Sequence, residues 1–232
     1  MNVSIHQPQY LPWLPLLLKI EQSDLFIFLD NVDFQKNGLQ NRNQIKSSQG
    51  PIWLTVPTYH KLGQKINDVK IDNSKNWRKK HWQSIQLCYR NAPFFKCYAK
   101  DLEVIYINEW SSLSDLNIET TNMLMKWMGI KTPIIRSSQM KAAGKASDLI
   151  HNLCVEVGAT SYISGIGGKE YLNSETFLNS NIDLFYKSYS LPKKYPQLFN
   201  QSGFFNDLSV IDILFNCGQD WRNYIKFENI AQ

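Results

Sequence analysis

Residues 2–30 read NVSIHQPQYLPWLPLLLKIEQSDLFIFLD. A short apolar segment stops at His6, a proline-rich turn follows, and residues 14–22 have helical character. Pro15 fits the first turn of that helix, where proline costs no backbone hydrogen bond. Residues 24–30 form an apolar run between two aspartates, which is typical of a strand buried on both faces. This strand–helix–strand order predicts a parallel pair with a right-handed crossover.

His6 and Asp30 lie at the ends of these two predicted strands. Because ligands of parallel sheets gather at the carboxyl ends of the strands, we expect both side chains at the ligand-binding edge, about one strand spacing apart. Imidazole has an unperturbed pKa suited to proton transfer near neutral pH, so we interpret His6 as the general base and Asp30 as the group that orients its ring. Two alternatives stay open, namely a histidine bonded within a turn and an aspartate that only caps a strand end.

The rest of the chain alternates strands and helices, which indicates an α/β fold with a mostly parallel central sheet flanked by helices. Further strands are expected at residues 52–57, 68–71, 133–136 and 182–186, and from residue 161 into a glycine-rich turn. Further helices are expected at residues 75–92, 100–107, 115–128, 147–157, 173–179 and 208–215. Residues 74–129 would be a helical portion of one continuous domain over residues 1–232, since no repeat or linker divides the chain.

Composition and charge limit the classes of function. The 232 residues are 43% hydrophobic and 19% charged, as in a soluble globular protein. The net charge of +5 is uneven, because residues 61–100 hold ten basic and two acidic residues. Such a segment suits phosphates or an acidic partner such as an acyl carrier protein, or it is a solvated face. It has no recognisable nucleic-acid-binding motif, so we expect no nucleic-acid partner.

Targeting and metal motifs are not visible. His6 and two prolines interrupt the apolar run that a signal peptide needs, and no stretch reaches the ~18 apolar residues of a membrane span. The four cysteines are scattered without CxxC spacing and the four histidines are far apart. We therefore expect a cytoplasmic protein with reduced thiols, no metal site and no cofactor.

Several polar and aromatic residues are candidates for substrate binding. Arg42, Lys46 and Lys19 could bind an anion such as a diphosphate, or form surface or internal pairs. Tyr10 and Trp13 either stack on a base or sugar ring or wedge the loop into the core, and for Trp13 we expect the core. His81 and Tyr89 have the same two interpretations. Residues 161–172, SYISGIGGKEYL, are a strand and a glycine-rich turn whose backbone N–H groups could meet a ligand oxygen.

The chain resembles the WbqC-like proteins along essentially its whole length. The opening motif His6-Gln7-Pro8-x-Tyr10-Leu11-Pro12-Trp13 is the most distinctive part. Further matching segments are Asn41-Arg42-Asn43-x-Ile45-Lys46, Leu54-Thr55-Val56-Pro57, Tyr162-Ile163-Ser164-Gly165, Tyr195-Pro196-Gln197 and Ser209-Val210-Ile211-Asp212. Pro15 departs from the pattern, because similar proteins carry glycine at that place, and the pocket could have a different shape there.

The resemblance implies a gene for O-antigen or a related surface polysaccharide. The activity it suggests is a transferase that attaches an acyl or aminoacyl group to the amino group of a nucleotide-activated amino sugar. The basic segment would suit an acyl thioester or an acyl carrier protein as donor. The expected catalytic residues are His6 and Asp30. The expected substrate-binding residues are Gln7, Tyr10, Lys19, Gln35, Asn41, Arg42, Lys46, His81, Tyr89, Ser164, Gly165, Gly168 and Tyr171.

Two other classes of function stay open. A strand that ends in histidine before a helix and a buried strand is similar to nucleotidyltransferases with an HxGH loop, although residues 6–10 contain no second histidine. A carrier-protein or glycan-binding module without catalysis would also use the basic segment. A serine hydrolase is disfavoured, since Ser164 lacks the GxSxG pattern.

Overall fold

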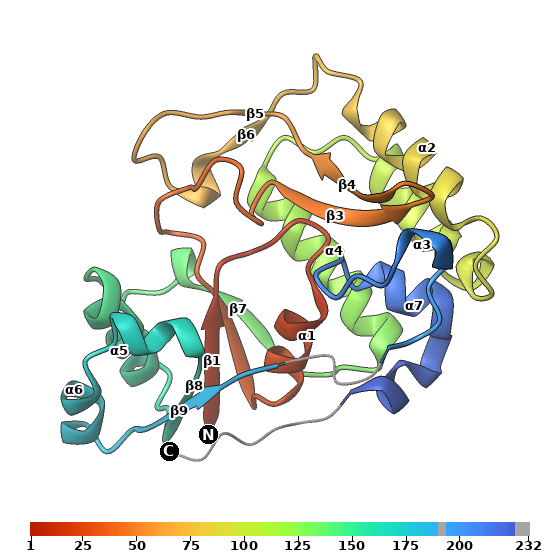
Figure 1. The fold of residues 1–232 in the computed structure, drawn as a ribbon. Helices are drawn as coiled ribbons and strands as arrows, with labels where there is room; N and C mark the ends of the chain where they lie inside the picture. The colour runs from red at the N-terminus through yellow and green to blue at the C-terminus, as the bar shows by residue number, and fades with distance from the viewer. Residues whose placement is uncertain (190–193, 226–232) are drawn as a thin grey trace.

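The fold is built on a five-stranded parallel sheet with the strand order β7-β2-β1-β8-β9 (Figure 1). The computed structural model describes residues 1–189 and 194–225. Strand β1 (Asn2–His6) is central and pairs with β2 (Leu25–Phe28) and β8 (Ser161–Gly165), while β7 (Ile134–Arg136) and β9 (Asp183–Lys187) form the edges. The predicted α/β class and the parallel pairing of the first two strands are confirmed.

The two faces of the sheet pack against different helices. Helix α1 (Leu14–Glu21) packs with Phe26 and Phe28 in the larger core. Helices α5 (Ala146–Glu156) and α6 (Ser174–Asn179) pack with Val3, Ile5 and Tyr162 in the smaller core. Because the side chains of a strand alternate between its faces, neighbouring residues of β2 enter different cores.

Strands β2 and β7 lie on one side of β1 in the sheet, and the later strands β8 and β9 lie on its other side. The connection through α1 leads from β1 to β2 on one side, whereas the connection through α5 leads from β7 back to β8 on the other side. A crevice at the carboxyl ends of the strands is the usual ligand site at such a topological switch point. The fold therefore singles out the ends of β1 and β8.

The predicted helical portion at residues 74–129 is confirmed. It consists of α2 (Trp77–Tyr89), α3 (Phe95–Ile107) and α4 (Leu113–Met128). Helix α3 begins five residues before the predicted start at residue 100. Helix α4 is followed by Gly129, whose φ of 72° is the left-handed conformation that favours glycine. Helix α7 (Ile211–Cys217) closes the larger core.

The sequence predicted no strand at residues 42–47, and the structure has one there. Strand β3 (Arg42–Ser47) pairs antiparallel with β4 (Gly50–Thr55) in a separate hairpin. Strands β5 (Thr58–Tyr59) and β6 (Lys70–Ile71) form a second two-stranded sheet. Both pairs lie apart from the central sheet, on the side of α2 (Figure 1).

Short 3-10 helices complete the structure. They are η1 (Ile66–Asp68), η2 (Ser137–Gln139), η3 (Ile166–Glu170), η4 (Asn200–Ser202) and η5 (Gly218–Tyr224). Across residues 1–189 and 194–225, none of the helices combines the length and the apolar character needed to cross a bilayer.

Candidate functional site

The candidate site lies where β1 and β8 separate at their carboxyl ends. The two strands pair from Asn2↔Ser161 to Ser4↔Ile163, although β1 continues to His6 and β8 to Gly165. The carbonyls of Asn2 and His6 accept bonds from the β2 side, so by alternation the carbonyl of Ile5 faces β8. Lys19 Nζ donates to that carbonyl at 2.8 Å. The Lys19 amine thus takes the place of the backbone N–H that would donate the next hydrogen bond between β8 and β1.

Lys19 is a buried lysine without an acidic partner. It is 5% exposed, and it forms no salt bridge within the described part of the chain. Its Nζ lies 5.9 Å from the centre of the Tyr162 ring. Burial lowers the pKa of Lys19 to about 7, because a charged amine loses hydration there, and the nearby Cys154 opposes the shift. Such a group can change its charge state near neutral pH.

His6 presents one unprotonated ring nitrogen. Its Nδ1 lies 2.9 Å from the carbonyl oxygen of Gln7, which can only accept, so Nδ1 carries the proton and Nε2 is left with its lone pair. Burial, and then the charge of Lys19, lower the pKa of His6 to about 4, while the bond to Gln7 acts in the opposite direction. The imidazole is therefore neutral at pH 7 with an unprotonated Nε2, although the lowered pKa makes it a weaker proton acceptor than an exposed imidazole.

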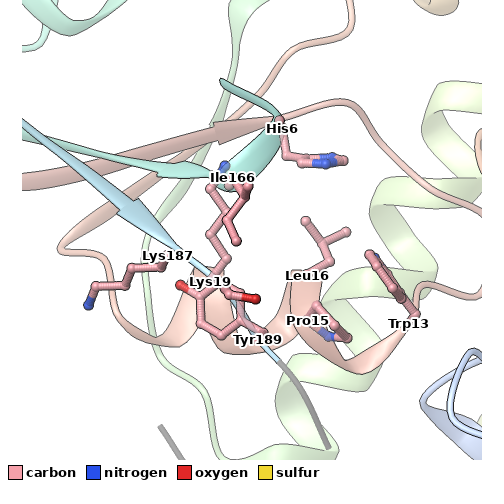
Figure 2. Close-up of a pocket in the computed structure, with 11 residues that line it drawn as sticks. His6, Trp13, Pro15, Leu16, Lys19, Ile166, Lys187 and Tyr189 are labelled. Atoms are coloured by element: carbon pink, nitrogen blue, oxygen red, sulfur yellow. The ribbon is translucent and has the colours of Figure 1, made fainter. Parts of the chain in front are cut away.

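Two cavities meet at His6 and Lys19, and both are also lined by Gly165 and Gly167. The smaller cavity, of about 290 Å³, has mostly apolar walls from Trp13, Pro15, Leu16, Ile166 and Tyr189. Figure 2 shows the His6 ring extending from the end of β1 above Leu16, and Trp13 lies beside Leu16. The Lys187 amine points away from these three side chains. The larger cavity, of about 420 Å³, includes Gln7, Ser164, Gly168, Glu170 and Tyr171.

Gly168 leaves no room for a side chain. A Cβ atom there would lie 2.1 Å from Ser164 Oγ and 2.9 Å from Leu172 Cδ1. At Gly165 and Gly167 a Cβ would meet no atom within 4 Å. The glycine-rich turn therefore folds tightly back on Ser164 at one point and stays open elsewhere along the cavity.

A third cavity, of about 530 Å³, adjoins the larger one through Gln7, Leu29, Ile150 and Tyr171. Gln35, Lys65 and Lys145 are among its lining residues. The Gln7 side-chain oxygen accepts a 2.8 Å bond from Gln40 Nε2, which fixes the amide of Gln7 at the junction. The structure thus brings eight predicted residues to one continuous edge: His6, Gln7, Lys19, Gln35, Ser164, Gly165, Gly168 and Tyr171.

Asp30 is held by serines and does not bond to His6. Its carboxylate accepts from Ser138 N and Ser138 Oγ, both at 2.9 Å, and from Ser137 Oγ at 3.2 Å. Asp30 is fully buried. The expected contact that would orient the imidazole is absent, and the Gln7 carbonyl holds the ring instead. A catalytic role of Asp30 stays a prediction.

Tyr10 and His81 lie in a buried polar cluster of the larger core. Tyr10 Oη lies 2.8 Å from His81 Nδ1 and 2.6 Å from Tyr106 Oη. Burial lowers the pKa of His81 to about 4, so this imidazole is neutral as well. These contacts match the core interpretation of both residues, and neither side chain lines the three cavities.

The hairpin residues make contacts of their own. Asn41 Nδ2 donates to the Val56 carbonyl at 3.1 Å, and the Arg42 guanidinium lies 4.2 Å from the centre of the Trp53 ring. Lys46 Nζ donates to the Gly203 carbonyl at 2.6 Å. Neither Asn41 nor Arg42 nor Lys46 lines the three cavities.

Tyr89 belongs to a buried network around Asp212. The Asp212 carboxylate accepts from Tyr89 Oη and Tyr195 Oη at 2.7 Å each, and from Gln197 Nε2 at 3.0 Å. Burial raises the pKa of Asp212, and these bonds oppose the shift. The network connects α2, through Tyr89, to α7 and residues 195–197, which lie more than 100 residues later in the chain.

Several lining residues were not predicted. Trp13 packs against the larger core, as expected, but it also lines the smaller cavity. Leu16 stands one helical turn before Lys19 on α1, a spacing that could have indicated a shared face. Lys187 ends β9, so the carboxyl-end rule that selected His6 could have found it too. Ile166 and Gly167 belong to the predicted glycine-rich turn, although neither was named, and Tyr189 gave no comparable signal.

A parallel α/β sheet with a cavity at its switch point defines a class of ligand-binding α/β proteins. The chain belongs to the WbqC-like protein family, whose sequence profile matches residues 7–224. It is 33% identical over 229 residues to the uncharacterized protein Rv1507c of Mycobacterium tuberculosis (strain H37Rv), which covers 97% of this chain and 98% of that protein. No solved structure matches the chain.

Proposed function

We propose that this protein is a cytoplasmic transferase of surface-polysaccharide biosynthesis. It attaches an acyl or aminoacyl group to the amino group of a nucleotide-activated amino sugar. The observation that carries the proposal is the unprotonated Nε2 of His6 beside the buried Lys19, at the junction of two cavities. Two cavities that share a base suit a reaction of two substrates.

In the proposed reaction, the sugar amine attacks the carbonyl carbon of an acyl thioester. A C–N bond forms and the C–S bond breaks. His6 Nε2 accepts the proton that the amine loses and passes it to the leaving thiolate, which departs as a free thiol. The charged form of Lys19 stabilises the negative charge that develops on the carbonyl oxygen.

The larger cavity suits the sugar, because Gln7, Ser164 and Tyr171 offer polar groups along its wall. The adjoining cavity contains Lys65 and Lys145, whose charges suit the diphosphate. Lys65 is paired with Asp33 at 2.7 Å on the protein surface, so Lys145 is the freer of the two cations. The thioester is carried by a small thiol cofactor or by an acyl carrier protein.

Turnover assays test the proposal. The protein is incubated with a panel of nucleotide-activated amino sugars and acyl or aminoacyl thioesters, and products are analysed by mass spectrometry and thiol release. The proposal expects an increase in sugar mass together with one thiol per product. Pyrophosphate release would instead identify a nucleotidyltransferase, and binding without any turnover would identify a non-catalytic module.

A further inference from the structure

The smaller cavity has the properties of a site for a short apolar chain with a polar head. Trp13, Pro15, Leu16, Ile166 and Tyr189 supply apolar wall, and His6 and Lys19 form the polar end that it shares with the larger cavity; Lys187 and Ser188 also line it. A volume of about 290 Å³ holds roughly ten water-sized groups at about 30 Å³ each. A sugar nucleotide is too large and too polar for this space.

Lys19 determines the chemistry of the head group. An ammonium buried without an acidic partner is costly unless hydrogen bonds or a ligand compensate for it. The Ile5 carbonyl accepts one of its three N–H bonds. A ligand oxygen that carries full or partial negative charge would use the remaining donors. A carboxylate or an acyl carbonyl fits this requirement, and an alcohol fits it poorly.

We propose that the smaller cavity is the acyl subsite of the protein, and that it takes an acyl group of roughly four to eight carbon atoms with its carbonyl oxygen on Lys19. The inference rests on the proposed transferase reaction and deepens it by naming the donor as a short-chain acyl thioester. Pro15 and Leu16 in the first turn of α1, with Ile166 opposite, set the limit on chain length.

Binding of free carboxylates tests the subsite without turnover. Acetate, hexanoate and dodecanoate are titrated by calorimetry, with hexanol as an uncharged probe of the same length. We expect hexanoate to bind at least tenfold more tightly than acetate or dodecanoate. Lys19→Met should weaken hexanoate at least tenfold and leave hexanol within twofold. Equal affinities for hexanoate and dodecanoate, or for wild type and Lys19→Met, would overturn the assignment.

Two substitutions fill the cavity, and one control places the same side chain elsewhere. Ile166 is 47% exposed, so Ile166→Trp should fold even if Leu16→Trp does not. Both should weaken hexanoate binding at least tenfold. Leu87→Trp, on an exposed position of α2, should leave it unchanged. Pro15→Gly should shift the preferred chain toward longer carboxylates. Hexanoate binding that survives both cavity-filling substitutions would place the acyl chain elsewhere.

The outcomes separate this inference from the proposed reaction. If hexanoate binds as expected but no thioester acylates any amino sugar, the subsite stands and the reaction fails. If acylation proceeds in Ile166→Trp with the chain-length preference of the wild type, the reaction stands and the subsite is wrong.

Discussion

Lys19 Nζ donates a 2.8 Å hydrogen bond to the carbonyl of Ile5 at the point where β1 and β8 part. The bond satisfies a strand carbonyl that lies beyond the last paired residues of β1 and β8, and it holds the Lys19 amine between two cavities. A side chain of α1 thus completes the edge of the sheet. The same contact explains how a costly buried amine is retained in a folded protein.

Lys19→Met should stabilise the protein at neutral pH. The amine has a pKa of about 7 in the folded state, against 10.5 when exposed, so between these values the unfolded chain binds more protons. Wild-type stability should therefore rise with pH by up to about 1.4 kcal/mol per unit in this range. The difference in free energy of unfolding between Lys19→Met and the wild type should therefore shrink as the pH rises. Urea unfolding at pH 7, 8 and 9 measures it, and parallel curves for the two proteins would contradict the shifted pKa.

His6→Ala should lower turnover by about 10²–10⁴-fold, because the reaction loses its proton acceptor. Affinity for the nucleotide sugar should change little, since most of the polar wall of the larger cavity remains. His151→Ala is the matched control, because this histidine bonds to Ser180 and lines none of the three cavities. Turnover of His6→Ala within a few-fold of the wild type would exclude His6 as the base.

Gly168→Ala should destabilise the glycine-rich turn, whereas Gly167→Ala should not. The added methyl group at residue 168 would collide with Ser164 Oγ, so the turn would have to move at a cost of about 1–3 kcal/mol. At residue 167 the methyl group meets open space. Thermal unfolding of the two variants measures the difference, and equal melting temperatures would show that the turn is not packed as described.

Tyr195→Phe should lower the free energy of unfolding by about 1–3 kcal/mol without altering the switch-point cavities. The substitution removes one of three donors to the fully buried Asp212 carboxylate and leaves that oxygen undersatisfied. Tyr59→Phe removes a tyrosine–aspartate bond at an exposed site, to Asp72, and should cost much less. Denaturant titration compares them; similar losses would mean that the Asp212 network contributes no special stability.

The sequence predicted the part of the site that follows from local patterns and general topology. An apolar run that stops at His6, a helix and a second apolar run were enough to place His6 at the carboxyl edge of a parallel sheet. The glycine-rich turn after β8 reached the same edge because it follows a strand as well. Gly168 and Tyr171, which the resemblance implied as binding residues, line the larger cavity there.

Other placements depended on partners that are distant in the chain. Lys46 is satisfied by the Gly203 carbonyl, 157 residues away, and Asp30 by serines 107 and 108 residues away. No local pattern shows such partners, so these contacts could not be predicted, and a binding role for the polar residues of the hairpin stays a prediction. Strand β3 of the hairpin was missed because buried polar side chains such as Asn43 interrupt its apolar alternation, whereas β4 overlaps the strand predicted at residues 52–57.

Substrate should bind between the carboxyl ends of β1 and β8. A crystal structure with a bound nucleotide-activated amino sugar tests this most directly. We expect ligand density in the larger cavity, with the amino group of the sugar facing His6 Nε2 and Lys19. Density at the hairpin beside Arg42 and Trp53, with the His6 cavity empty, would contradict it.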